Sequence, residues 1–174
     1  MRTFKYFTKG VCLLGLLGVV GFAITSIVSP TAFLKTAYAL IASEFGDIPA
    51  ISSNSLRSQL VNNNQHNVIV DVRNPEERHV STIPGAISQE DFERDRTDYQ
   101  NKQIVVYCTI GYRSGHYVRL LRQQGFDAYN LSEGILGWTQ IDGQLINARG
   151  QVTKQVHVYS RPWNLAVKDH TVIF

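Results

Sequence analysis

The sequence predicts an α/β protein in which a central parallel sheet is flanked by helices and preceded by an N-terminal transmembrane helix. Three observations lead to this prediction. Short apolar segments alternate with segments of helical periodicity through most of the chain after residue 47. Two of the apolar segments, 68–72 and 103–107, are nearly continuous, as expected for strands that are covered on both faces. Near the N-terminus, residues 11–28 carry no charge.

The uncharged segment 11–28 is long enough to cross a membrane. At about 1.5 Å per residue it covers roughly 27 Å, which is close to the hydrocarbon thickness of a bilayer. Basic residues precede it and predict that the N-terminus stays in the cytoplasm while the rest of the chain is translocated. We therefore expect a single-pass membrane protein that contacts the bilayer through 11–28.

A cleaved signal peptide is the alternative, because residues 37–39 have the small-x-small form of a cleavage site. The soluble part would then be exported. In either case we assign residues 1–34 to a membrane anchor or signal segment. Residues 35–47 are expected to form a linker with some helical character.

Composition and charge exclude several function classes. The formal net charge is +3, and Arg2, Lys5 and Lys9 account for it, so the rest of the chain is close to neutral. No basic stripe interleaved with aromatic residues is present, so we expect no nucleic-acid partner. The chain has two cysteines, Cys12 and Cys108, which excludes a disulfide framework and a zinc site with several cysteine ligands. We expect no metal ion and no cofactor.

The first half of the soluble part contains two predicted strands and two predicted helices. Residues 49–51 are a short edge strand, and 52–61 form a helix that begins at a serine cap. Residues 68–72 form the first central strand. The turn at 74–77 places proline at the first position of a helix, and we expect its two glutamates, at 76 and 77, to be exposed. A bend follows at 83–87.

The second half repeats this alternation. Residues 103–107 are the second central strand, and 113–124 form an amphipathic helix. A further strand at 126–131 and a helix at 133–140 complete the predicted domain, which we assign to residues 48–143. Residues 144–174 contain a turn and a short alternating strand, and we expect an extension that packs on the domain.

One loop carries the chemistry. Cys108 follows the strand 103–107, and Asp71 ends the strand 68–72; ligands of such sheets bind at this edge. A short loop with a glycine comes after the cysteine, Arg113 lies five residues beyond it, and a helix begins there. Backbone N–H groups and the positive end of the helix dipole favour an anion at this position. We therefore expect Cys108 to be a reactive thiolate.

An ordered set of motifs resembles a known family. The set comprises Asp71-Val72-Arg73, Glu77, Ile83-Pro84-Gly85-Ala86, the run from Cys108 to Ser114, and Gly134 with Trp138. Over roughly residues 48–140 this set resembles the rhodanese-like sulfurtransferase domain. The resemblance implies a small α/β domain whose catalytic cysteine carries a persulfide. The chain departs from the family pattern at Ser81-Thr82, where Gly-His is usual, and at Glu133-Gly134, where two glycines are usual.

The resulting hypothesis is sulfur transfer through a Cys108 persulfide. The donor would be a small sulfur anion such as thiosulfate, and the acceptor a thiol or cyanide. Arg113 would orient the donor or stabilise the departing anion. The loop residues that would bind substrate are Thr109, Ile110, Gly111, Tyr112 and Ser114. Asp71 and Arg73 would support the loop without reacting.

Two other functions are open at this point. A cysteine phosphatase also pairs a loop cysteine with an arginine, although its loop has five intervening residues and this one has four. The smaller ring suits a sulfur atom better than a tetrahedral phosphate. The other alternative is a non-catalytic, membrane-tethered binding module, against which the presence of both Cys108 and Arg113 argues.

Overall fold

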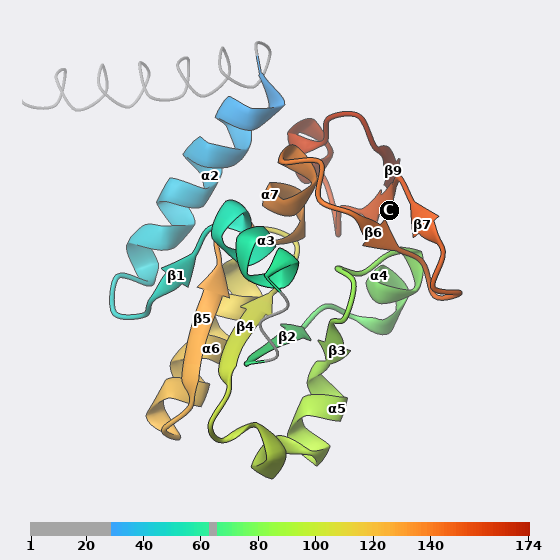
Figure 1. Cartoon of the computed structure of the whole chain (residues 1–174). Coiled ribbons are helices and arrows are strands. Elements are labelled where there is room, and N and C mark those ends of the chain that lie inside the picture. Colours follow the sequence, from blue (N-terminus) through green and yellow to red (C-terminus); the bar gives the residue numbers. More distant parts are fainter. Residues whose placement is uncertain (1–28, 63–65) are drawn as a thin grey trace, which may run out of the picture.

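The structure is a computed structural model that describes residues 29–62 and 66–174 (Figure 1). The predicted transmembrane segment 11–28 lies outside the described residues, so it stays a prediction. Within the described residues, no helix combines the length and the apolar character needed to cross a membrane.

The predicted central parallel sheet is confirmed. Five parallel strands lie in the order β1-β5-β4-β2-β3. Their bounds are β1 Ala50–Ile51, β2 Asn67–Asp71, β3 Ile87–Ser88, β4 Gln103–Tyr107 and β5 Asp127–Leu131. The central strands β2 and β4 pair along their full length and bring Asp71 opposite Tyr107 at the carboxyl edge of the sheet. Cys108 directly follows at this edge.

Helices cover both faces of the sheet (Figure 1). The helices are α2 Pro30–Glu44, α3 Ser53–Val61, α4 Pro75–Val80, α5 Gln89–Arg94, α6 Tyr112–Gln123 and α7 Gly134–Gln140. Because side chains alternate along a strand, Ile104 and Val106 belong to a core with α5 and α6, whereas Val105 joins a second core with α2, α3 and α7. Both cores are closed to solvent at these strand positions.

Helix α5 and the 3-10 helix η1 (Arg96–Tyr99) were not predicted from the sequence. Ser88 caps α5, because its hydroxyl accepts a hydrogen bond from the Asp91 N–H at 2.9 Å. Phe92 is fully buried and stacks on Tyr99 with ring centroids 5.5 Å apart. One buried aromatic residue therefore fixes a segment whose other residues are mostly polar.

Residues 35–47, expected to form a linker with some helical character, lie mostly within α2 and the turn after it. The helix begins at the Ser29 cap, and Phe33 and Leu34 are fully buried. The helix packs on α7 and on the C-terminal segment. The burial of its apolar side makes α2 part of the folded body, which is the physical reason that it does not behave as a linker.

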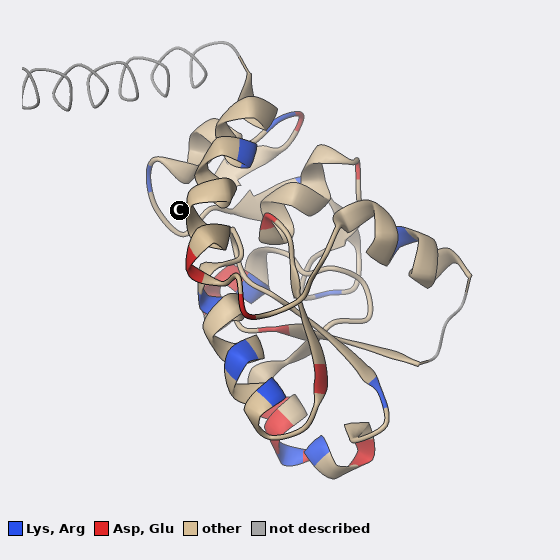
Figure 2. Ribbon diagram, turned by 90° about the vertical axis from the view of Figure 1, so that its left-hand side faces the viewer, with Lys and Arg blue, Asp and Glu red and all other residues tan. Residues whose placement is uncertain are grey.

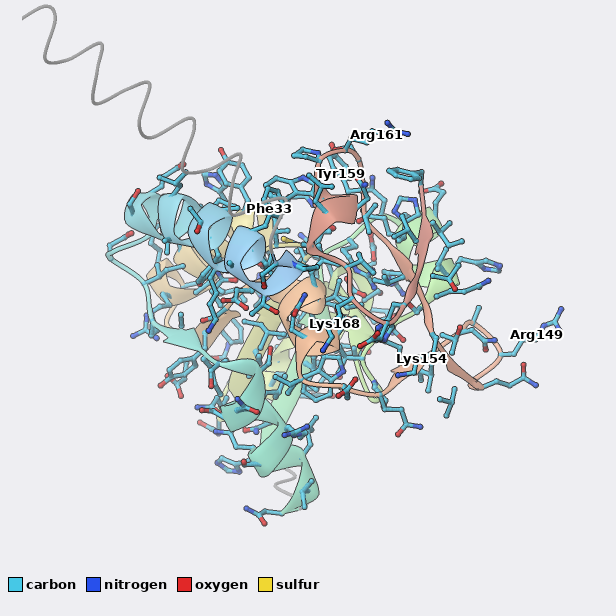
Figure 3. The ribbon with its side chains drawn as sticks, turned by 90° about the horizontal axis from the view of Figure 1, so that it is seen from above. Phe33, Arg149, Lys154, Tyr159, Arg161 and Lys168 are labelled. Atoms are coloured by element: carbon cyan, nitrogen blue, oxygen red, sulfur yellow. The ribbon has the colours of Figure 1, made fainter. Side chains whose placement is uncertain are left out.

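The C-terminal segment 144–174 packs on the domain at the carboxyl edge of the sheet (Figure 3). It contains an antiparallel pair, β6 (Leu145–Ile146) with β7 (Val152–Thr153), and a parallel pair, β8 (Gln155–His157) with β9 (Thr171–Ile173). Strand β8 packs on α4, and the 3-10 helix η2 (Trp163–Ala166) packs on α2. The N-terminal and C-terminal parts of the described chain therefore meet beside the sheet.

Basic and acidic residues lie close together along α6 (Figure 2). Arg119 binds Asp47 at 2.6 Å, and Arg122 lies 3.6 Å from Asp127. These cations of α6 are therefore paired within the protein.

Candidate active site

The loop after β4 places the Cys108 sulfur at the start of α6. The Gly111 N–H donates a hydrogen bond to Cys108 Sγ at 3.2 Å, and the Ser114 hydroxyl lies 3.5 Å from the same sulfur. Gly111 has a φ of +97°, a conformation that glycine adopts without the steric cost of a Cβ. This turn allows the chain to fold back over the sulfur before α6 begins at Tyr112.

Two neighbouring elements hold the loop in place. Asn130, at the end of β5, donates a side-chain hydrogen bond to the Gly111 carbonyl at 2.9 Å. At the start of α7 the Ile135 N–H donates to the Cys108 carbonyl at 2.9 Å. Gly134 allows this approach, because a Cβ built on it would lie 2.4 Å from the Cys108 carbonyl oxygen. The cysteine backbone is thus fixed from outside the loop.

Arg113 forms an ion pair that the sequence did not suggest. Its two terminal nitrogens bind the two carboxylate oxygens of Glu77, each at 2.8 Å, and Thr109 Oγ1 donates to the same carboxylate at 2.9 Å. The expectation that Glu77 is exposed was wrong, since its side chain is 2% exposed. The short helix α4 turns this residue toward the cysteine loop.

The pKa values of Glu77 and Arg113 are both shifted in the direction that favours this ion pair. Burial opposes the charge on both groups, yet the pKa of Glu77 is lowered, because Arg113 and the Asn74 backbone N–H hydrogen-bond to its carboxylate. Burial likewise opposes protonation of Arg113, but its pKa is raised by Glu77 and by the nearby Cys108. Both groups therefore stay charged at neutral pH.

Asp71 and Arg73 form a second, fully buried ion pair beside the loop. Arg73 Nη2 lies 2.7 Å from Asp71 Oδ2 and also donates to the Ser81 carbonyl at 2.6 Å. Burial and the neighbouring Asp71 raise the pKa of Tyr107, whose hydroxyl donates to Asp71 at 2.6 Å and accepts from the Ile83 N–H at 3.1 Å. The pair thereby ties the ends of β2 and β4 to the bend at 81–83.

A cavity of about 440 Å³ opens beside the cysteine loop. Cys108, Thr109, Ile110, Tyr112 and Arg113 line it from the loop, which we call the loop side. Ile41, Tyr159 and Trp163 line it from α2 and the C-terminal segment, which we call the outer wall. Cys108 is 1% exposed as a residue, and it nevertheless reaches the cavity.

Of the predicted site residues, Cys108, Thr109, Ile110, Tyr112 and Arg113 line this cavity. Gly111 and Ser114 contact the Cys108 sulfur without lining it, and Asp71 and Arg73 also lie outside the lining. The outer wall was missed. Tyr159 and Trp163 are aromatic residues of the C-terminal extension, and such residues are usually core positions, so their sequence carried no signal of a ligand site. Tyr38 of α2 was also missed; its ring lies 2.8 Å from where a Cβ of Gly111 would stand.

The fold and the loop define a rhodanese-like α/β domain. The model of the family described as "Rhodanese-like domain" matches residues 53–141, about half of the chain, and the chain belongs to this family.

Relatives and solved structures agree with this assignment. The chain is 43% identical over 70 residues to a tRNA sulfurtransferase of Desulfurococcus amylolyticus, over 39% of this chain and 14% of that protein. A crystal structure of a thiosulfate sulfurtransferase from Pseudomonas aeruginosa superposes with a TM-score of 0.55 at 24% identity, over 68% of this chain and 23% of that chain. The chain therefore spans a small part of either protein.

A solution structure of a rhodanese-like domain from Anabaena superposes with a TM-score of 0.52 at 25% identity, over 65% of this chain and 83% of that chain. Here most of the other chain is covered. The matched family segment 53–141 contains the whole cysteine loop, whereas Ile41, Tyr159 and Trp163 lie outside it.

Proposed function

We propose that this protein is a sulfurtransferase that carries a sulfur atom on Cys108 as a persulfide. The observation that supports it most directly is the placement of Cys108, which lines the cavity and whose sulfur accepts a hydrogen bond from the loop amide of Gly111. Family membership and the sulfurtransferase relatives point to the same reaction class.

The proposed reaction has two steps. The Cys108 thiolate attacks the outer sulfur of a donor such as thiosulfate, the sulfur–sulfur bond to sulfite breaks, and sulfite leaves with the bonding electrons. The persulfide anion on Cys108 then transfers its outer sulfur to an acceptor thiolate or cyanide, which regenerates the Cys108 thiolate. The Gly111 N–H and the Ser114 hydroxyl are placed to hydrogen-bond the sulfur anion in the resting state.

The sequence predicted that Arg113 orients the donor or stabilises the departing anion, and this proposal gives it a different role. Because both of its terminal nitrogens bind Glu77, it acts mainly as a positive charge at the cavity wall and as a tie between the loop and α4. A donor anion would meet a guanidinium whose fork is already occupied.

Intact-mass measurement after incubation with thiosulfate tests the proposal. The wild-type protein should gain one sulfur atom, cyanide should remove it as thiocyanate, and Cys108→Ser should gain nothing. Hydrolysis of an aryl phosphate without any sulfur gain would instead favour the phosphatase alternative. Absence of phosphatase activity and of sulfur gain from thiosulfate and from organic thiosulfonates would favour a binding module and would overturn sulfur transfer.

A further inference from the structure

The cavity above Cys108 is apolar to a degree that an inorganic sulfur anion does not require. Five of the side chains that line it are aliphatic or aromatic: Ile41, Ile110, Tyr112, Tyr159 and Trp163. A volume of about 440 Å³ lies in the range of pockets that bind small organic molecules. Such a lining stabilises an apolar ligand body by removing it from water.

Two polar side chains of the lining, Thr109 and Arg113, already bind protein partners. The Thr109 hydroxyl donates to Glu77 and lies 3.1 Å from an Arg113 nitrogen, and Arg113 itself binds the Glu77 carboxylate with two nitrogens. Among the lining residues, all of which the structure describes, Arg113 is the one that carries a positive charge. A small doubly charged donor would therefore have to compete with Glu77 for it.

The outer wall covers the same arginine from the other side. The Arg113 guanidinium lies over the Tyr159 ring, 4.9 Å from its centroid. Tyr159 has a φ of +67°, which is rare for an aromatic residue, and its N–H donates to His157 Nδ1 at 3.0 Å. This contact holds a strained backbone that directs the ring over the cavity, and strained residues of this kind gather at ligand sites.

Trp163 and Ile41 complete the wall from separate elements. The Trp163 ring packs on Phe33 of α2, with centroids 6.2 Å apart, and Ile41 stands on the same helix. Figure 3 shows Phe33 and Tyr159 on the neighbouring segments that meet here. Two parts of the chain that lie outside the matched family segment therefore build one apolar surface opposite the sulfur.

From these contacts we infer that the sulfur donor is an organic sulfane-sulfur compound with an apolar body, which the outer wall binds. The inference rests on the proposed function and specifies its substrate. Written for an organic thiosulfonate, the Cys108 thiolate bonds to the terminal sulfur, the bond between that sulfur and the sulfonyl sulfur breaks, and the organic sulfinate leaves with the electron pair. The charge is the same on both sides of this step.

The test compares benzenethiosulfonate with methanethiosulfonate, which share the reacting group and the charge and differ in the apolar body. The rate of sulfur gain on Cys108 is followed by intact mass for both donors, and free cysteine in solution gives the intrinsic ratio of the two. We expect the wild-type protein to exceed that intrinsic ratio by at least about tenfold in favour of the phenyl donor, a typical discrimination by an apolar pocket.

Variants of the outer wall should remove this preference. Trp163→Ala and, from a different element, Ile41→Ala should each lower the phenyl-to-methyl ratio by several-fold. Leu165→Ala is the matched control, since Leu165 lies in the same 3-10 helix, is 43% exposed and does not line the cavity. A thermal melt of each variant checks its folding, and either wall variant that folds is sufficient.

The outcomes separate the two proposals. Sulfur gain from both donors at the intrinsic ratio, or wall variants that keep the wild-type ratio, would overturn the apolar-donor inference and leave sulfur transfer standing. No sulfur gain on Cys108 from either thiosulfonate or from thiosulfate would overturn the proposed function, and the inference with it.

Discussion

The loop side and the outer wall of the cavity are built differently. The loop side is polar beneath its surface: Glu77, Arg113 and Thr109 form one hydrogen-bonded group, and a buried Asp71–Arg73 pair stands behind it. The outer wall consists of one aliphatic and two aromatic side chains from two distant segments. The loop side lies within the matched family segment and the outer wall outside it. Under the proposed function, the family segment carries the reaction and the flanking segments carry the donor preference.

If the loop side depends on buried charge pairs, breaking one should have the largest effect on folding. Asp71→Ala leaves Arg73 buried and unpaired, and we expect it to lower the free energy of unfolding by about 3–5 kcal/mol. Urea unfolding measures this loss. Asp127→Ala is the matched control, because Asp127 pairs with Arg122 at the surface and should contribute less than about 1 kcal/mol. Equal losses in the two variants would contradict the buried-pair account.

Disrupting the close contact between α7 and the cysteine backbone should cause the next largest loss in the free energy of unfolding. Gly134→Ala adds a methyl group 2.4 Å from the Cys108 carbonyl oxygen at a residue with a φ of +56°. We expect a loss of about 1–2 kcal/mol from the left-handed backbone and about 1–3 kcal/mol from the clash. The rate of sulfur gain should fall as well, because the loop must move.

Gly85→Ala separates these two contributions. Gly85 has a φ of +79°, and a Cβ there would meet nothing within 4 Å, so this variant carries the backbone cost alone. Unfolding measurements on both variants should therefore show a larger loss for Gly134→Ala. A loss at Gly85 as large as that at Gly134 would mean that the contact with Cys108 is unimportant.

Removing the Glu77–Arg113 ion pair should cause a smaller loss in the free energy of unfolding, and this loss should depend on pH. Glu77→Gln removes a carboxylate that accepts hydrogen bonds from a charged partner, and we expect a loss of about 1.5–3 kcal/mol at neutral pH. The folded pKa of Glu77 is lowered below its ordinary value of 4.5, so the unfolded state binds more protons between the two values. The stabilisation is therefore present above pH 4.5 and is lost as the pH falls through the folded pKa.

Urea unfolding of wild type and Glu77→Gln at several pH values measures this. The difference in free energy of unfolding between the two proteins should shrink below pH 4.5, because the wild-type protein loses stability more steeply than Glu77→Gln does. A gap that stays constant down to pH 3 would show that the carboxylate charge does not stabilise the loop.

Sequence reasoning predicted the loop side well because its signals are local. The run 104–107 is continuously apolar, β4 has the predicted bounds 103–107, and the cysteine, glycine and arginine after it are close in sequence. The contact between Glu77 and Arg113 joins residues 36 positions apart, and nothing in the helix start at 75–77 indicated which way its glutamates point. That direction depends on the packing of α4.

The outer wall could not be predicted either, because it depends on packing between residues that lie even farther apart in the sequence. Ile41 and Trp163 are separated by most of the chain, and they meet because α2 packs on η2. Neither segment has a period that fixes its orientation. Helix α2 carries alanines and apolar residues on several sides, so its sequence suits a linker or a membrane-adjacent helix as well as a packed one.

The smallest predicted effect concerns Glu133, a departure from the family pattern at the start of α7. Glu133 precedes α7 with a φ of +62°, in the left-handed region where glycine is favoured. Glu133→Gly removes a backbone strain of about 1–2 kcal/mol from the folded state. Glycine also makes the unfolded chain more flexible, which lowers the free energy of unfolding by about 0.5–1 kcal/mol. We expect a net gain of about 0.75 kcal/mol, the difference between the midpoints of these two ranges, in the free energy of unfolding measured with urea.

Glu133→Gln distinguishes backbone strain from charge at this position. Burial raises the pKa of Glu133, so its ionised form weakens the folded state above the ordinary value of 4.5, and this weakening disappears as the pH falls below that value. Glu133→Gln should therefore stabilise at pH 7 and lose this gain near pH 4, whereas the backbone part of the Glu133→Gly gain should persist at both. If Glu133→Gly stabilised no more than Glu133→Gln at acid pH, the left-handed backbone would cost no more than the freer unfolded chain of glycine does, and the start of α7 would be less strained than its geometry implies.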